Sequence, residues 1–487
     1  MKTLKDILYG VSVAEITGDP SVAITSVQFD SRRVRDHTLF VAIRGTVTDG
    51  HRYISPAICN GAIAVLCEEM PPERDAAVTY VVVANTAQAL GVAASNYYDN
   101  PSSKVKLIGI TGTNGKTTTA TLSYRLFRAL GYACGLISTI QIRIADKRLD
   151  TDRTTPDAMG LNRVLKQMVD AGVAYVFMEV SSHAIAQHRI AGLHFDGAVF
   201  TNLTHEHLDY HQTFASYRDA KKAFFDRLPI RSFALFNADD KNGSVMVQNT
   251  RAKVYTYALR RAADFKARVL ENHFSGMLLS INGTDLFSPL VGAFNAYNLL
   301  AVYGIATLLD RDDAAILRAM SLLRGVKGRF QYAQSDTGIH LLIDYAHTPD
   351  ALSKVLKTID DLRTRNENLI TVLGCGGNRD KSKRPEMARI AANLSDQVVL
   401  TSDNPRCEDL SVILRDMQAG ITPDLASKVL TVADRKKAIE MACEMAAAAD
   451  IVFLAGKGHQ HYEEVQGVRY PFDEFAILIE SLQKLKK

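Results

Sequence analysis

An apolar, strand-like run passes through a glycine-rich turn into a helical stretch in Val105-Lys106-Leu107-Ile108-Gly109-Ile110-Thr111-Gly112-Thr113-Asn114-Gly115-Lys116-Thr117-Thr118. Beyond it, Leu122, Leu126 and Leu130 recur every four residues and therefore share one face of a helix. Glycines let backbone amides approach phosphate oxygens, and a helix N-terminus adds partial positive charge. A lysine can then neutralise the outer phosphates and a threonine can coordinate Mg²⁺. We therefore predict an ATP site at Gly112, Thr113, Asn114, Gly115, Lys116, Thr117 and Thr118, although the strict P-loop pattern has glycine where this chain has Ile110.

Working outward, other apolar runs alternate with helical stretches. Runs at 174–178 and 197–200 follow the phosphate loop, and those at 341–343, 369–373, 398–400 and 451–454 form a later group. Such alternation is typical of parallel sheets covered by helices. The sequence predicts a three-domain α/β chain: an N-terminal α/β domain at 1–101, a central P-loop ATPase-like domain at 102–332, and a C-terminal Rossmann-like domain at 333–487.

The length of the chain agrees with the predicted three domains, since 487 residues are more than one hydrophobic core usually supports. The net charge is +4 and the basic residues are spread along the chain, which does not favour nucleic acid as a partner. The six cysteines lack CxxC spacing, as expected of a reducing compartment. There is no signal core and no run of about 18 apolar residues. We expect a cytoplasmic protein, without membrane insertion, that acts as a monomer.

Further motifs carry a resemblance to a known family. Residues 111–118 read Thr-Gly-Thr-Asn-Gly-Lys-Thr-Thr, and they are followed in order by Met-Glu-Val-Ser-Ser-His at 178–183, Thr-Asn-Leu-Thr-His-Glu-His-Leu-Asp-Tyr-His at 201–211, Asp-Tyr-Ala-His-Thr-Pro at 344–349 and Gly-Lys-Gly-His at 456–459. In this set and order the chain resembles the Mur ligase family. The resemblance implies an ATP-dependent amide ligase, which transfers the ATP γ-phosphoryl group to a substrate carboxylate and lets an amine attack the acyl phosphate.

The resemblance also implies catalytic and metal-binding residues. Lys116 is the catalytic P-loop lysine, and Thr117, Glu179 and His207 match the Mg²⁺ ligands of the family. Lys221, four residues after Tyr217, matches a lysine that is carbamylated in the family and so becomes an anionic ligand. Lys222 is rotated by about 100° around the same helix and cannot take that place. On the nucleotide side, the family pattern is matched by Asn295, Asn298, Arg329, Asp344 and His347, although Phe294 stands where histidine is common. We expect domain closure over ATP, which keeps water from the acyl phosphate.

The first domain resembles that of the tripeptide-forming members of the family, in which its loops hold uridine diphosphate. The expected uridine contacts are Phe29, Ser31, Thr46, Val47 and Thr48. Folylpolyglutamate synthetases share the ATP machinery but would not carry this domain. Contacts to the rest of UDP-N-acetylmuramoyl-L-alanyl-D-glutamate are implied for Thr154, Thr155, Ser181, Gln187 and Arg189, whereas Arg153 stays unassigned.

The choice of amino acid is implied by Asp403, Asn404, Pro405 and Arg406, together with Arg379. An arginine can grip a carboxylate with two parallel hydrogen bonds, which favours meso-diaminopimelate over lysine because lysine lacks the distal carboxylate. Gly456 and Gln460 complete the expected site. Gln460 stands where the family has a glutamate that faces the distal ammonium, a role that Glu463 or Glu464 could fill instead.

The alternative functions are an L-lysine-adding or dipeptide-adding member of the family and a non-catalytic scaffold. Intact Lys116, Glu179, His207 and Lys221 argue against the scaffold.

Overall fold

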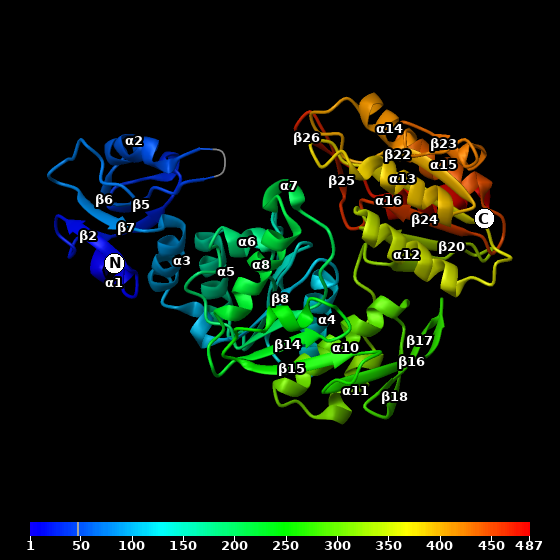
Figure 1. Ribbon diagram of the computed structural model, residues 1–487, viewed down its shortest axis with the longest axis horizontal. Helices are drawn as coiled ribbons and strands as arrows, with labels where there is room; N and C mark the ends of the chain where they lie inside the picture. Colours follow the sequence, from blue (N-terminus) through cyan, green and yellow to red (C-terminus); the bar gives the residue numbers. More distant parts are fainter. Residues whose placement is uncertain (46–47) are drawn as a thin grey trace.

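The computed structural model describes residues 1–45 and 48–487, so the predicted uridine contacts Thr46 and Val47 lie outside the described residues. Over the described ranges, three large sheets follow one another along the chain (Figure 1), each with a parallel core. The α/β class predicted from the sequence is confirmed.

The central sheet contains the strand that leads into the phosphate loop. Its strand order is β11 (Lys147–Leu149), β10 (Ile142–Ile144), β9 (Cys134–Ile137), β12 (Tyr175–Glu179), β8 (Lys106–Thr111), β13 (Gly197–Phe200), β14 (Phe233–Asn237), β15 (Lys253–Ala258), β16 (Phe265–His273), β17 (Gly276–Ile281) and β18 (Thr284–Ser288). Within this order, the seven neighbouring strands β9, β12, β8, β13, β14, β15 and β16 pair in parallel. Antiparallel strands extend the sheet at both edges. The phosphate loop therefore leaves the carboxyl end of a strand in the middle of the sheet, where open α/β sheets bind ligands.

Helices cover both faces of this sheet, because the side chains of each strand alternate between them. In β8, Ile108 and Ile110 enter one core and Leu107 enters the other. The helices are α4 (Lys116–Ala129), α5 (Ala158–Asp170), α6 (Ser182–Ala186), α7 (Leu208–His211), α8 (Phe214–Asp226), α9 (Gly243–Met246), α10 (Ala293–Leu308) and α11 (Asp313–Ser321). Leu122 and Leu126 are fully buried on α4 as predicted, whereas Leu130 is the half-buried residue that ends the helix.

The N-terminal sheet is smaller and packs into two hydrophobic cores, one of which also contains Ala158 of α5. Its order is β2 (Val13–Thr17), β7 (Thr79–Val83), β6 (Ala62–Cys67), β5 (Thr38–Val41) and β4 (Ser26–Gln28), with the pair β1 (Lys2–Thr3) and β3 (Ala23–Ile24) beside it. The helices are α1 (Leu4–Ile7), α2 (Ile54–Cys59) and α3 (Thr86–Tyr97), with short 3₁₀ turns η1 (Ser31–Arg33), η2 (Gly50–Tyr53) and η3 (Pro101–Lys104). Helix α3 packs against α5, which joins this unit to the side of the central one (Figure 1).

The C-terminal sheet has the order β19 (Gln331–Gln334), β20 (His340–Asp344), β24 (Ile451–Ala455), β21 (Leu369–Cys375), β22 (Gln397–Ser402) and β23 (Val429–Thr431), parallel except for β19. A hairpin of β25 (Tyr462–Val465) and β26 (Val468–Pro471) lies apart. The helices, which pack on both faces, are α12 (Pro349–Leu362), α13 (Lys383–Leu394), α14 (Leu410–Gln418), α15 (Arg435–Met445) and α16 (Glu474–Leu485), with the turn η4 (Ala426–Lys428).

Between the central and C-terminal units lies a cleft of about 1910 Å³. Its described lining includes Thr139, Glu206 and His207 from the central unit and His347 and Arg406 from the C-terminal unit. Phe274, on the β16–β17 hairpin, stacks on residues of β19 and β20 and so supports the junction.

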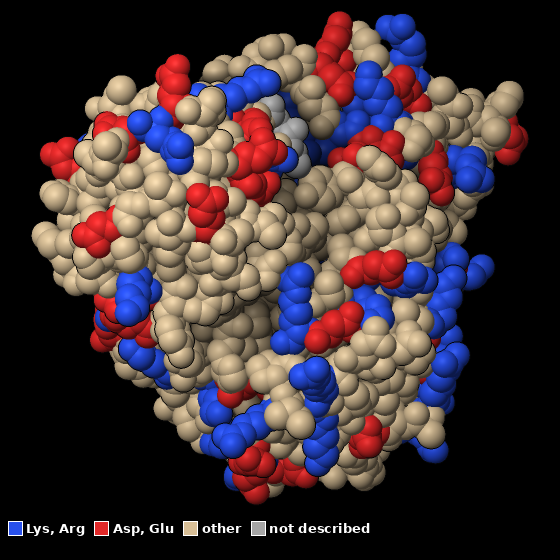
Figure 2. Space-filling model, turned by 60° about the vertical axis from the view of Figure 1, so that its left-hand side comes forward, with Lys and Arg blue, Asp and Glu red and all other residues tan. Residues whose placement is uncertain are grey.

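The surface chemistry agrees with the modest net charge. Figure 2 shows lysines and arginines interspersed with acidic residues over the face in view. Among the described residues, no helix is both long and apolar enough to span a bilayer.

Candidate active site

The phosphate loop is built where β8 passes into α4. Gly115 is the N-cap residue of α4, with a φ of +86°, a conformation that glycine adopts readily, and it has no side chain with which to cap the helix. The first-turn amides are thus left for an anion, as at other phosphate sites. The half-buried Lys116 donates from its Nζ to the carbonyls of Gly112 (2.9 Å) and Thr113 (2.7 Å). Burial lowers the pKa of Lys116, while Glu206 and Glu179 oppose this shift.

A hydroxyl and a carboxylate meet next to this loop. Thr117 Oγ1 donates to Glu179 Oε2 (2.9 Å), and the backbone amide of Thr139 donates to Glu179 Oε1 (2.6 Å). Glu179 ends β12 and is fully buried. Arg329 Nη2 reaches Thr117 Oγ1 from the domain junction (3.2 Å).

These oxygens fit Mg²⁺. Among the described residues, no three His, Cys, Asp or Glu side chains form a complete metal cage. Mg²⁺ does not need one, because it is usually held by one or two carboxylates together with phosphate oxygens and water. The paired Thr117 and Glu179 oxygens beside a phosphate loop are such a donor set.

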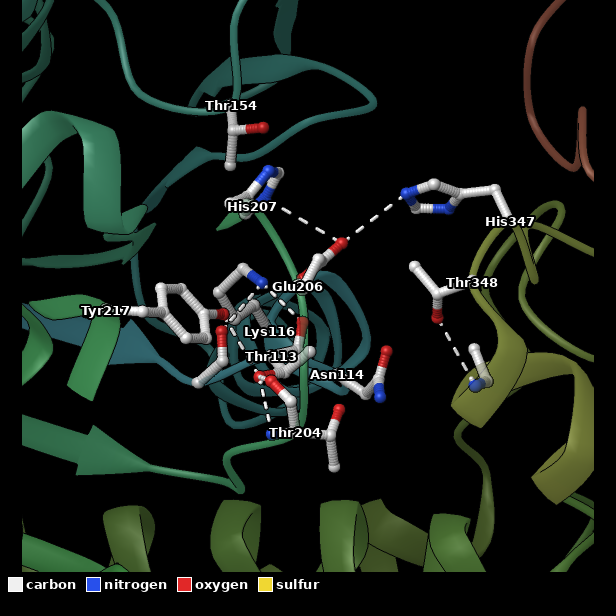
Figure 3. A network of polar contacts seen from close by, with 12 residues as sticks. Thr113, Asn114, Lys116, Thr154, Thr204, Glu206, His207, Tyr217, His347 and Thr348 are labelled. Carbon is white, nitrogen blue, oxygen red and sulfur yellow. Dashed lines mark hydrogen bonds and ion pairs between the residues drawn. The ribbon is translucent and has the colours of Figure 1, made fainter. Parts of the chain in front are cut away.

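Glu206 joins the central and C-terminal units. Its Oε1 lies 3.7 Å from His207 Nε2 and 3.5 Å from His347 Nε2, and Figure 3 shows it between these two rings. Burial alone would raise the pKa of Glu206. The contact with His347 and the nearby His207 and Lys116 outweigh that effect, so the pKa of Glu206 is lowered overall. For His207, burial lowers the pKa to about 4, which leaves a neutral imidazole at neutral pH, the form that binds metals. Glu206 is a site residue that the sequence reasoning missed, although the motif at 201–211 contains it.

The two adjacent lysines of α8 have different surroundings. Lys221 is buried, and its Nζ donates to the same Gly112 carbonyl as Lys116 (2.9 Å) and lies 4.7 Å from the centre of the Tyr217 ring. Burial, followed by the charge of Lys116, lowers the pKa of Lys221 well below its ordinary value. Lys222 instead pairs with Asp226 along the helix (2.7 Å). Only Lys221 therefore faces the phosphate loop.

The residues expected on the nucleotide side lie in two groups. Asn298, buried in α10, accepts from Thr119 Oγ1 of α4 (3.3 Å) and donates to Asn295 (3.0 Å), so these amides lie behind the loop. Asp344 lies at the junction, where its Oδ2 accepts from the backbone amide of Phe330 (2.6 Å), and burial raises its pKa to about 6.

The side chains expected to hold the muramoyl-dipeptide come together around Glu179. Thr155 Oγ1 donates to the carbonyl of Glu179 (2.8 Å), and the amide of Ser181 donates back to Thr155 Oγ1 (3.2 Å). Arg189 donates to the Thr155 carbonyl and to Gln187, whose amide donates to Tyr210. Thr154 accepts from Thr139 Oγ1 (3.1 Å) and lines the cleft. One wall next to the phosphate loop thus contains all five.

The uridine residues lie on a different part of the molecule. Phe29 is 38% exposed, Ser31 begins η1, and Thr48 Oγ1 is 3.3 Å from the hydroxyl of Tyr53. These three belong to the N-terminal unit and are absent from the described lining of the cleft.

The residues expected to bind the amino acid occupy loops at the carboxyl ends of β21, β22 and β24. Asp403, Asn404, Arg406, Arg379, Gly456 and Gln460 all line the cleft, whereas Pro405 does not. The buried Lys457 Nζ pairs with Asp403 (3.3 Å) and donates to Asn404 Oδ1 (3.0 Å). Arg406, at a φ of +53°, donates to the Gly377 carbonyl (2.7 Å). Lys457 is a second residue that the sequence reasoning missed, and it belongs to the quoted motif at 456–459.

The phosphate loop contacts a second α/β unit beside the cleft, where Asn114 Nδ2 donates to Asp350 Oδ2 (3.3 Å). This arrangement is that of a nucleotide-dependent enzyme, and comparisons with known proteins give the family. The Mur ligase middle domain matches residues 110–306, the Mur ligase glutamate ligase domain 328–458, and the Mur ligase family catalytic domain 23–98. The chain belongs to the Mur ligase family.

Particular relatives are similar over their whole length. A UDP-N-acetylmuramoyl-L-alanyl-D-glutamate--2,6-diaminopimelate ligase from Cytophaga hutchinsonii is 53% identical over 485 residues, covering 99% of this chain and 100% of that protein. The protein of the same name from Bacteroides fragilis is 53% identical over 477 residues, covering 98% of each chain. A solved structure with this name matches with a TM-score of 0.71 at 30% identity and covers 100% of both chains.

Proposed function

We propose that this protein is an ATP-dependent ligase that adds meso-diaminopimelate to UDP-N-acetylmuramoyl-L-alanyl-D-glutamate in the synthesis of peptidoglycan precursors. One observation carries the proposal: Thr139 and Thr154, which lie beside Glu179, line the same cleft as Arg379 and Arg406 of the C-terminal unit. The phosphate loop adjoins this cleft, because its Asn114 Nδ2 donates to Asp350 Oδ2, a lining residue of the C-terminal unit (3.3 Å). An amide ligase needs a triphosphate, a carboxylate and an amine within reach of one another. The full-length similarity to ligases with this substrate in their names supports the choice of substrates.

In the proposed reaction, the amides of the phosphate loop and Lys116 hold the β- and γ-phosphates of ATP. The substrate's glutamyl carboxylate, bound by Thr154, Thr155, Ser181 and Arg189, attacks the γ-phosphorus and displaces ADP to give an acyl phosphate. The amine of diaminopimelate then attacks the acyl carbon, phosphate leaves, and the amine loses a proton. Negative charge gathers where carboxylate meets triphosphate, so the cations Lys116 and Arg329 stabilise the transition state.

Mg²⁺ would be held by Thr117, Glu179, His207 and a carbamylated Lys221, and it would neutralise phosphate charge. The carbamate is supported by the depressed pKa and burial of Lys221, because only the uncharged amine reacts with CO₂. A carbamate would also exchange a buried cation for an anion beside Lys116, which removes a like-charge contact.

We assign the uridine nucleotide to residues 1–101, ATP to 102–332 and the amino acid to 333–487. Phe29, Ser31 and Thr48 are proposed uridine contacts, and Arg379 and Arg406 are proposed to hold the distal carboxylate. Asn295 and Asn298 are assigned to adenine, with Asp344 and His347 closing from the C-terminal side. The enzyme is proposed to act as a cytoplasmic monomer.

The test is ATP-dependent phosphate release with UDP-N-acetylmuramoyl-L-alanyl-D-glutamate, supplied separately with meso-diaminopimelate and with L-lysine. We expect release with meso-diaminopimelate and little with lysine. Release with lysine alone would make the protein a lysine-adding ligase, and no release with either would refute ligase activity.

A further inference from the structure

The C-terminal wall of the cleft pairs an acid with Arg406. Glu464 lies in β25, and its carbonyl accepts the Arg406 amide (2.9 Å), while the Gln466 amide donates to the Arg406 carbonyl (2.7 Å). The two side chains are each 22% exposed, and both line the cleft. Their backbones are thus hydrogen-bonded to each other, so the pair is held by the fold.

We propose that Glu464 holds the distal ammonium of the amino-acid substrate, next to an Arg406 that holds the distal carboxylate. This inference rests on the proposed function and makes it more specific, because it names the residue that selects for a second amino group. The distal carbon of diaminopimelate carries both a carboxylate and an ammonium, so its complement is a cation and an anion side by side.

The geometry of the pair suits a ligand. Glu464 Oε2 lies 3.8 Å from Arg406 Nε and 4.0 Å from Arg469 Nε, distances too long for hydrogen bonds. Among the described residues, the Arg406 side chain donates a hydrogen bond only from Nη1, to the Gly377 carbonyl, which leaves its Nε and Nη2 donors available. Each partner can therefore make charge-assisted hydrogen bonds to a zwitterion without first breaking a strong contact.

Neighbouring candidates are engaged elsewhere. Gln460 is neutral, and its Oε1 already accepts from Asn404 Nδ2 (2.8 Å). Glu463 accepts from the Ser402 hydroxyl (2.7 Å) and does not line the cleft. Asp403 is paired with the buried Lys457 (3.3 Å). Of these acids, Glu464 is the one that is both in the cleft and next to Arg406.

Two substrates separate this role from a structural one. 2-Aminopimelate keeps the distal carboxylate of diaminopimelate but lacks the distal ammonium. For Glu464→Gln we expect kcat/KM with meso-diaminopimelate to fall by about 10- to 100-fold, the range for a lost charged hydrogen bond, and kcat/KM with 2-aminopimelate to stay unchanged. Glu463→Gln is the matched control, and it should leave the ratio of the two values as in the wild type.

Two results would overturn the proposal. The first is a Glu464→Gln variant in which the ratio of kcat/KM for meso-diaminopimelate to kcat/KM for 2-aminopimelate equals that of the wild type. A Gln460→Glu variant with a higher kcat/KM for meso-diaminopimelate would count equally, since Gln460 would then face the ammonium. The second needs no variant: equal kcat/KM for the two substrates in the wild type would mean that no charge holds the distal ammonium. Absence of any meso-diaminopimelate turnover by the wild type would instead refute the proposed function.

Discussion

Two lysines from distant parts of the sequence share a single carbonyl oxygen, that of Gly112. Lys116 comes from the first turn of α4 and Lys221 from the middle of α8. Two ammonium groups so close together are unfavourable without anions, which supports the proposal of nucleotide phosphates near Lys116 and of a modified Lys221.

Replacing Lys116 with Ala removes the cation that we propose binds the β- and γ-phosphates. We expect ATP-dependent phosphate release to fall by at least about 100- to 1000-fold, as when one preorganised donor to a transition state is lost. The assay is initial-rate phosphate release at saturating amino acid. A variant with near-normal release would remove Lys116 from the nucleotide site.

Lys221 and Lys222 form a matched pair for the carbamate. Lys221→Ala should be almost inactive and partly rescued by added short carboxylates, because these supply the missing anionic group. Lys222→Ala loses a partly buried pair with Asp226 along the same helix and no contact with the phosphate loop, so its activity should be close to that of the wild type. Exchanged phenotypes, or carboxylate rescue of neither variant, would argue against a carbamate at Lys221.

The family resemblance singled out Lys221, and its angular position on a helix set it apart from Lys222, but the sequence analysis did not find Glu206 or Lys457. Both belong to quoted motifs. Their roles depend on neighbours far away in the chain, His347 for Glu206 and Asn404 for Lys457, and no local spacing encodes such contacts.

At the scale of elements, the buried strands follow the sequence prediction closely. The continuous apolar runs at 341–343, 369–373, 398–400 and 451–454 all lie in parallel strands, because strands covered on both faces need apolar residues throughout. The hairpins formed by β16, β17 and β18 were not predicted from the sequence. Asn282-Gly283, at φ values of +48° and +89°, is the turn signal that predicts one of them.

A buried ion pair fixes how the C-terminal helices sit on their sheet. Arg435 of α15 pairs with Glu474 of α16 (2.5 Å) and donates to carbonyls at the ends of β22 and β24. Glu474→Ala leaves that guanidinium without its charge partner, so we expect a loss of about 3–5 kcal/mol in the unfolding free energy. Urea unfolding measures it.

The control for this stability change is Lys166→Ala, which breaks the exposed pair with Asp170 on α5. It should change the unfolding free energy by less than about 1 kcal/mol. Equal urea midpoints for Glu474→Ala and the wild type would show that the buried pair does not stabilise the C-terminal unit.

At the scale of the molecule, the N-terminal unit lies to one side of the cleft and contacts the central unit through α3. Its proposed role is to hold one end of a long substrate whose other end reacts elsewhere. Such a division separates binding from chemistry, so substitutions in the two regions should change different kinetic constants.

Ser31→Ala should therefore raise the KM for the uridine-nucleotide substrate by about 5- to 10-fold, the value of one hydrogen bond, with kcat unchanged. Steady-state kinetics with varied nucleotide substrate check this. Ser21→Ala, in an exposed turn of the same unit, serves as the control. A large fall in kcat at constant KM would place Ser31 near the reacting centre instead.

The most direct measurement of the central claim is the mass of the product formed when meso-diaminopimelate and L-lysine compete at equal concentration. The reaction contains the wild-type protein, ATP, Mg²⁺ and UDP-N-acetylmuramoyl-L-alanyl-D-glutamate. We expect the diaminopimelate adduct as the dominant product, formed with one phosphate released per amide bond. A dominant lysine adduct, or equal amounts of both, would contradict the assignment of Arg406 and its loop to the distal carboxylate.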